Sequence, residues 1–476
     1  MPNWELSELI EWDEKIRGKV EEFGLDCYPQ EFELCDHTGM LGYMAYTGMP
    51  SHYPHWSYGK SYEKLKTLYD HGVSGLPYEM VINSNPAIAY LMRDNTLLLQ
   101  ILTCAHVYGH NDFLKNNFTY RSTRADYTIE LFKAHALRVR KYVEDPSIGI
   151  DKVERILDAA HALQWQCRHN LAIRKLSPEE QVERVVESAQ PRPDPFHKIH
   201  ARRAFTEPDL HKLPIEPEED LLLFIRDYNP YLAQWEKDLL TIVDQQSKYF
   251  IPSMETKIMN EGWASYWHKR ILESLDLPQS LRLEFIVRHN QVVRPIPGQI
   301  NPYHLGLRIW EDLYRRHTNP TKEEIERDGA PVKSGEAKLF EAREVERDSS
   351  FIRRYLTYDL MREMDMFQWE ARGDDLVISK VSDDEGWREV KEQLIRSVGS
   401  ASIPVIKIED ADFGQNRTLY LKHYHDGREL QLEYAEKTLA YLNRLWGREV
   451  ALETNLQGKR TLLGYNERGF STRALK

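Results

Sequence analysis

The stretch from Asn95 to Asn117 constrains the fold most, because its pattern predicts one long apolar helix with two histidines inside it. His106 and His110 are four residues apart, so both imidazoles leave the same face of that helix about one turn apart. This spacing is typical of helical zinc sites. Two histidines also reach this spacing by chance, so a metal site needs support from elsewhere in the chain.

That support comes from a second predicted helix, at 255–275, which contains Asn-Glu-Gly-Trp-Ala at 260–264. Glu261 and His268 are seven residues apart, or about two turns, and therefore share one face. A carboxylate and an imidazole on one helix supply half of a metal site. The alternative is structural: Glu261 would favour the dipole of the helix start, and His268 would be a buried core histidine.

The element at 260–264 resembles the Asn-Glu-Gly-Phe-Ala element of zinc aminopeptidases of the gluzincin type. In that family the Glu is the third zinc ligand and follows a His-Glu-x-x-His helix. The resemblance implies Zn²⁺ bound by His106, His110 and Glu261. One position departs from the pattern, because Val107 stands where those peptidases carry their general-base Glu, and valine cannot accept a proton. Either another residue supplies the base, or the metal is structural or absent.

A closer similarity, over nearly the whole chain, is to the stage V sporulation protein R (SpoVR) family. The stretches that carry it are AHVYGHNDFLKNN at 105–117, KIMNEGWASYWH at 257–268, RHNQVVRP at 288–295 and NPYHLGLRIWEDL at 301–313. The resemblance implies a sporulation role linked to formation of the spore cortex, which is peptidoglycan. Members of this family are often associated with a serine protein kinase and a von Willebrand-type domain protein, so the resemblance implies partners of these kinds.

Three side chains could act as the general base in place of Val107: His268, Glu79, or Glu261 if it is not a ligand. His268 ranks first because it shares a helix face with Glu261; alternatively, it is a fourth metal ligand. Glu79 lies on a predicted strand just before the His106 helix, where zincin-type peptidases keep the edge strand that binds extended substrate.

A predicted helix start at Asn301-Pro302 brings two further candidates. The helix dipole disfavours a charged imidazole there, so a neutral His304, or Tyr303 beside it, could donate a hydrogen bond to a developing oxyanion. A surface histidine on a capped helix explains His304 equally well.

Two functions follow from these residues. The first is a zinc-dependent hydrolase-like protein on a zincin-like helical scaffold, which cleaves an amide bond in a peptide or a cell-wall precursor. The second is a non-catalytic scaffold or adaptor with a degenerate metallopeptidase site. Val107 favours the second function, whereas the retained ligand set favours the first.

The formal net charge of −12 argues against non-specific binding to nucleic acid. The N-terminus is acidic, and no run of about eighteen uncharged apolar residues occurs, so we expect no membrane span and a cytoplasmic location. The four cysteines form no Cys-x-x-Cys pair, which indicates free thiols in a reducing cytosol.

The chain changes character after a charged stretch at 318–346 that contains Gly329-Ala330-Pro331. Strand-like alternation follows at 375–381, 403–409 and 417–423, then an amphipathic helix at 433–446 and a strand–turn–strand pattern at 450–463. The sequence therefore predicts a mainly α N-terminal domain with a few strands, at 1–335, and a small α+β C-terminal domain, at 345–476. The second domain should contribute no metal ligand and is expected to be a binding or regulatory module.

Overall fold

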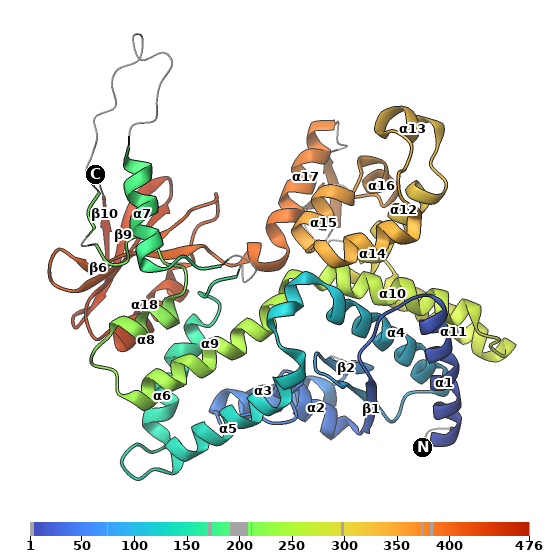
Figure 1. Cartoon of the computed structure of the whole chain (residues 1–476), viewed down its shortest axis with the longest axis horizontal. Coiled ribbons are helices and arrows are strands. Elements are labelled where there is room, and N and C mark those ends of the chain that lie inside the picture. The colour runs from blue at the N-terminus through green and yellow to red at the C-terminus, as the bar shows by residue number, and fades with distance from the viewer. Residues whose placement is uncertain are drawn as a thin grey trace. The chain divides into compact units, whose positions relative to one another are not determined.

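The computed structural model describes residues 4–73, 75–169, 174–190, 208–210, 212–296, 299–366, 368–372, 375–380 and 384–475. Contacts divide the chain into two compact units, residues 1–138 with 250–402, and residues 139–249 with 403–476. Both units are therefore built from two separate stretches of the chain, as the colours of Figure 1 indicate.

The first unit is mainly helical. Its helices are α1 (Leu6–Glu22), α2 (His37–Ala45), α3 (Trp56–Asp70), α4 (Leu97–Asn116), α10 (Lys257–Ser274), α11 (Gln279–Val293), α12 (Pro302–Thr318), α13 (Lys322–Asp328), α14 (Gly335–Val345), α15 (Asp348–Tyr355), α16 (Tyr358–Glu363) and α17 (Asp384–Ser397). Short 3-10 turns are η1 (Phe118–Ser122), η2 (Ala125–Tyr127) and η3 (Gly399–Ser402).

Two small sheets accompany these helices. The first has the order β1-β3-β2, with β1 (Gln30–Cys35) parallel to β3 (Ala87–Met92) and β2 (Glu79–Ile82) antiparallel to it. The second is the antiparallel pair β4 (Gln368–Arg372) and β5 (Asp375–Lys380). In the first sheet β2 lies at an edge, immediately before the chain turns through β3 into α4.

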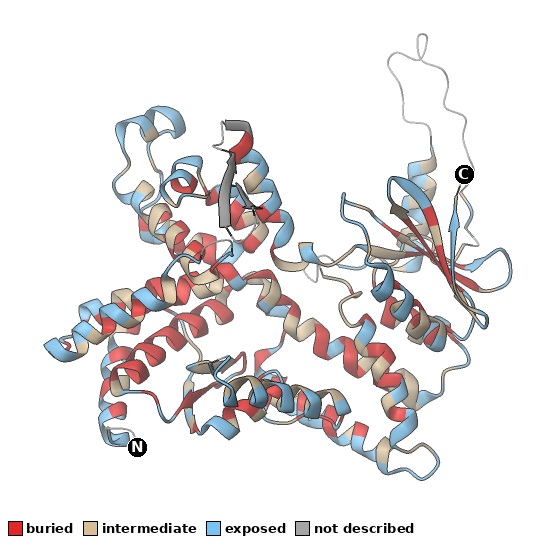
Figure 2. Cartoon of the chain, turned by 180° about the vertical axis from the view of Figure 1, so that it is seen from behind, coloured by how far each residue is buried: buried red, intermediate tan, exposed pale blue. Residues whose placement is uncertain are grey.

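The core of the first unit is the packing of α10 between α4 and α12. Helix α4 is buried on all sides, and each residue from Leu98 to Leu114 is buried (Figure 2). Glycines let the three helices approach closely. A Cβ on Gly109 of α4 would lie 2.7 Å from the Ala264 Cα, and one on Gly262 would lie 2.3 Å from the carbonyl carbon of Gly306 in α12. These contacts fix how α10 faces α4.

Buried carboxylates from neighbouring elements hold α10 in place. Asp348 accepts hydrogen bonds from the backbone N–H groups of Ile258 and Met259, both at 2.9 Å, and so satisfies donors in the first turn of α10. Asp112 of α4 accepts from the indole of Trp263 at 2.9 Å and pairs with the buried Arg343 of α14 at 2.6 Å. A buried carboxylate is stable only with such partners.

The second unit combines helices with a five-stranded sheet. The sheet order is β10-β9-β8-β7-β6, in which only β7 and β8 are parallel. Its strands are β6 (Ile406–Phe413), β7 (Thr418–His423), β8 (Val450–Leu456), β9 (Lys459–Asn466) and β10 (Gly469–Ala474). Its helices are α6 (Ile150–Leu163), α7 (Pro178–Ala189), α8 (Leu221–Tyr228) and α18 (Leu432–Trp446); the limits of the units fall within α5 (Thr128–Glu144) and near the end of α9 (Gln234–Glu255).

The predicted fold class, mainly α with a small α+β part at the C-terminus, is confirmed. The alternating stretches at 403–409 and 417–423 form β6 and β7, and the amphipathic stretch at 433–446 forms α18. The predicted domain limits 1–335 and 345–476 differ from the residues at which the chain passes between the two compact units. They stay a prediction about the domain boundary. Among the described residues, no helix combines the length and the apolar character that crossing a membrane requires.

Candidate metal centre

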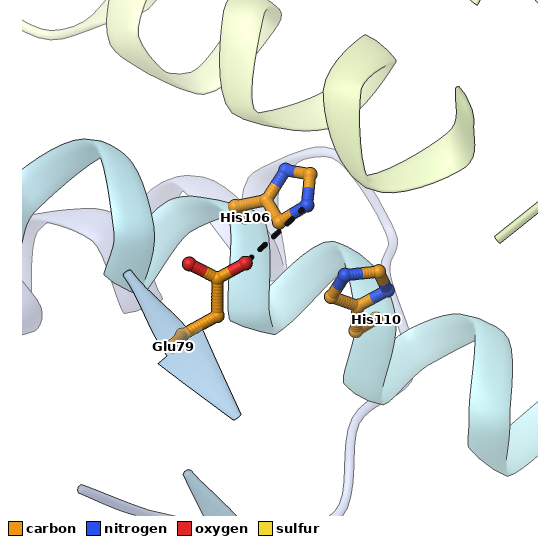
Figure 3. A group of neighbouring side chains, drawn as sticks. All are labelled: Glu79, His106 and His110. Atoms are coloured by element: carbon orange, nitrogen blue, oxygen red, sulfur yellow. Dashed lines mark ion pairs between the residues drawn. The ribbon is translucent and has the colours of Figure 1, made fainter. Parts of the chain in front are cut away.

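Three side chains from two elements form a group that could hold a metal ion. Helix α4 contributes His106 and His110, and the edge strand β2 contributes Glu79; their ligand atoms all lie within 4.8 Å of one another. Figure 3 shows the Glu79 carboxylate facing the His106 imidazole, with His110 one turn further along α4. The Glu79 Oε1 atom is 4.0 Å from the His106 Nε2 atom.

Helix α10 adds a fourth donor, Glu261. Its Oε2 atom is 3.5 Å from His110 Nε2 and 3.7 Å from His106 Nε2. Both Glu261 Oε2 and His106 Nε2 are buried and have no hydrogen-bond partner among the described residues. Two ligands of one tetrahedral zinc ion lie roughly 3.3–3.6 Å apart when their bonds are about 2.0–2.2 Å long. The spacing of these donors is close to what a shared cation needs. Burying such polar atoms without a partner costs folding free energy, and a bound cation would remove that cost.

Hydrogen bonds behind the two imidazoles favour metal binding. The Nδ1 atom of His110 is 2.9 Å from Oδ1 of Asn260, and that oxygen can only accept. His110 therefore carries its hydrogen on Nδ1 and keeps a lone pair on Nε2, toward Glu261. The Nδ1 atom of His106 is 2.9 Å from Nδ1 of His268. With His106 as the donor, its Nε2 also keeps a lone pair for an ion.

Burial keeps the imidazoles of His110 and His268 neutral. It lowers the pKa of His110 to about 4, helped by the neighbouring His106, and it lowers the pKa of His268 well below its usual value. A neutral imidazole is the form that binds a metal ion.

The two carboxyl groups respond in opposite directions. Burial raises the pKa of Glu79, and the charge of Glu261 adds to this effect. Burial also acts to raise the pKa of Glu261, but the neighbouring His106, His110 and Tyr303 side chains outweigh it, so that this pKa is lowered. Glu261 is thus the more readily ionised of the two.

The structure brings His106, His110, Glu261 and Glu79 together, as well as His268, although their roles stay predictions. His268 lies behind His106, and its other nitrogen, Nε2, is 2.8 Å from Nδ1 of His289. Both ring nitrogens of His268 are therefore in hydrogen bonds with other histidines.

His304 is directed elsewhere. Its Nδ1 atom is 2.8 Å from the Val293 carbonyl oxygen at the end of α11. The neighbouring Tyr303 faces the centre instead: its ring lies 6.0 Å from the His106 ring, and its side chain helps to lower the pKa of Glu261.

Sequence reasoning missed two residues that support the centre from behind, Asn260 through His110 and His289 through His268. Asn260 is adjacent to Glu261, and His289 lies in the stretch RHNQVVRP, but neither showed a ligand spacing. Residues that contact a ligand from behind leave no periodic signal, because their partners lie on other elements.

Comparisons with known proteins agree over almost the full length of the chain. A family model described as SpoVR like protein matches residues 3–403, and one described as SpoVR-like C-terminal domain matches residues 404–457. A protein of Escherichia coli (strain K12) with the name uncharacterized protein YcgB is 34% identical over 479 residues, which cover 95% of this chain and 92% of that protein. No solved structure matches.

Proposed function

The chain belongs to the SpoVR-like protein family, and from this premise we propose that it is a zinc-dependent hydrolase that cleaves an amide bond. One observation carries the proposal: the buried atoms His106 Nε2 and Glu261 Oε2 face each other at 3.7 Å without a hydrogen-bond partner among the described residues. Two imidazoles and one carboxylate are the donors of many catalytic zinc sites.

We assign the metal ligands as His106, His110 and Glu261. Glu261 Oε2 lies 3.5 Å from His110 Nε2 and 3.7 Å from His106 Nε2, close to the edge length of a tetrahedral zinc site, whereas Glu79 lies further from His106, at 4.0 Å. When bound there, zinc would polarise a substrate carbonyl and help a water molecule to lose its proton.

We assign the general base to Glu79. Val107 cannot accept a proton, and both nitrogens of His268 are already in hydrogen bonds, so His268 would act only through His106. The Glu79 carboxylate faces the same space as the ligand atoms and could accept a proton there. Tyr303 is the better candidate than His304 for donating a hydrogen bond to the oxyanion, because His304 is bonded to a backbone carbonyl.

An extended peptide is the substrate that the edge strand favours. Strand β2 pairs with β3 on one side, and no described strand pairs with its other side. Met92 N–H donates to the Tyr78 carbonyl, so by the alternation of antiparallel pairs the backbone groups of Glu79 and Val81 point to the open side. A peptide, or the peptide part of a cell-wall precursor, could add to this edge beside the centre. A precursor made in the cytoplasm would suit the role in cortex formation that the resemblance to this family implies.

Metal analysis of the purified chain tests the centre. We expect close to one zinc per chain in the wild type and a large loss in Glu261→Ala, because one of three ligands is removed. A wild-type protein that holds no zinc after incubation with zinc and desalting would overturn the proposal.

The base assignment is tested with Glu79→Gln. Glutamine keeps the shape of the side chain but cannot take a proton, so the variant should retain zinc and lose about 10²–10⁴-fold in turnover of a short alanine-rich peptide. Full zinc content with unchanged turnover would remove Glu79 from this role.

A scaffold or adaptor with a degenerate site is the second candidate, and Val107 is the observation that favours it. This function predicts that the wild type binds zinc yet cleaves no peptide. It also predicts that the chain retains a serine protein kinase or a von Willebrand-type domain protein in a pull-down with purified proteins.

A further inference from the structure

Three buried histidines from three helices form a continuous hydrogen-bonded row that ends at the centre. His106 of α4 contacts His268 of α10 at 2.9 Å, and His268 contacts His289 of α11 at 2.8 Å. Their exposed fractions are 4%, 0% and 8%. In such a row the hydrogen on one ring determines where the next ring can carry its own, because each neutral imidazole has one donor and one acceptor.

The row has two possible orders, and they have opposite consequences for a metal ion. In the first, His106 donates from Nδ1 to His268, and His268 donates from Nε2 to Nδ1 of His289. His106 Nε2 then keeps its lone pair for an ion. In the second, His289 donates from Nδ1 to His268, and His268 donates to Nδ1 of His106. His106 must then carry its hydrogen on Nε2, where it faces Glu261 and excludes an ion.

His289 is the outermost ring of the row, so its tautomer selects between the two orders. We propose that His289 is a positioning residue, which by accepting a hydrogen bond from His268 holds His106 in the tautomer that binds the metal. The inference rests on the proposed metal centre.

The packing of α11 supports a specific role for His289. Among the described residues of this helix, only Phe285 and His289 are buried, whereas Leu283, Ile286 and Val287 are largely exposed. A histidine at one of two buried positions is costly unless its ring nitrogen is bonded, and the bond it makes leads to the centre. An apolar residue at 289 would pack there as well but would leave His268 Nε2 without an acceptor.

Zinc affinity, measured by competition with a chromophoric chelator, tests the proposal without any need for activity. We expect His289→Ala to bind zinc about 10–100-fold more weakly than the wild type, the usual effect of removing a partner behind a ligand. His289→Asn should recover most of the affinity, because its amide oxygen can accept from His268. His317→Ala is the matched control: His317 is a half-buried histidine of α12 bonded to the Leu313 carbonyl, and its loss should leave the affinity unchanged.

The tautomer itself is read from ¹⁵N-histidine NMR of the metal-free protein. We expect His106 to carry its hydrogen on Nδ1 in the wild type and in His289→Asn, and to populate the Nε2 form in His289→Ala. Only the proposed role, and not a general loosening of the helix, predicts that the asparagine variant restores both the tautomer and the affinity.

The outcomes separate this proposal from the one it rests on. If the wild type binds no zinc, the metal centre fails and the role of His289 fails with it. If the wild type binds zinc and folded His289→Ala binds it equally well, the centre stands and the role of His289 is overturned. If His289→Ala does not fold, His289→Asn decides: a folded asparagine variant with weak zinc binding also overturns it.

Discussion

Asp348 shows how a single carboxyl group can link the stability of α10 to pH. Burial raises the pKa of Asp348 to about 7, against the two backbone N–H groups that lower it. An unfolded aspartate has a pKa near 3.8, so between these values the folded chain keeps a proton that the unfolded chain releases. The stability that this proton contributes is complete below about pH 4 and is lost as the pH rises through about 7.

We therefore expect wild type and Asp348→Asn to differ in their pH dependence. Asparagine does not titrate, so the melting temperature of the wild type relative to the variant should fall between pH 5 and pH 8. Thermal unfolding followed by circular dichroism at several pH values measures this difference. Parallel curves for the two proteins would show that Asp348 does not hold the proton.

Individual residues differ in how far the sequence could predict them. His106 and His110 follow from helical spacing, and Glu261 from its place in Asn-Glu-Gly-Trp-Ala. From the sequence, His268 ranks first as the general base because it shares a helix face with Glu261. In the structure its two ring nitrogens are hydrogen-bonded to His106 and His289. Helical spacing gives the face of a residue and not the partner that its ring nitrogen meets.

At the scale of elements, the crossing of α10 and α12 depends on two glycines. A Cβ on Gly306 would lie 2.1 Å from the Ile258 carbonyl oxygen, which belongs to a helix backbone and cannot rotate away. Gly306→Ala should therefore push the helices apart and lower the free energy of unfolding by about 1–3 kcal/mol or more. Gly18→Ala in α1 is the control, since no atom lies within 4 Å of its Cβ, and it should raise stability slightly.

Urea unfolding of both variants and the wild type measures this difference. A Gly306→Ala protein as stable as Gly18→Ala would contradict the close approach of the two helices.

The elements themselves were predictable where their pattern is local. Period-two alternation predicted β6 and β7, and one apolar run predicted α4. The parallel pairing of β1 with β3 was not predictable in this way, because α2, α3 and β2 separate the two strands along the chain. Pairing between distant strands depends on the packing of the whole unit, which one sequence window does not contain.

At the scale of the whole molecule, limited proteolysis tests the predicted limits at 335 and 345. The segment between α12 and α14 is highly exposed, and Val332 is 99% accessible, so the first cut should fall at 320–345. Because α14 contacts α12 and α15 contacts α10, the two fragments should stay together in size-exclusion chromatography. Fragments that separate would mean that residues 345–476 form an independent domain, and a first cut at 95–115 would contradict the boundary altogether.

The glycine contacts between α4, α10 and α12 also bear on how the ion would be selected. Because these helix backbones pack directly against one another, the donors of His106, His110 and Glu261 have little freedom to move apart around a larger ion. Calcium prefers six to eight oxygen ligands at about 2.3–2.6 Å, and a rigid cage with two nitrogen donors cannot supply them. The same rigidity means that the donors are held in place by the helix packing itself, unlike those of the small zinc modules, which fold only around their ion.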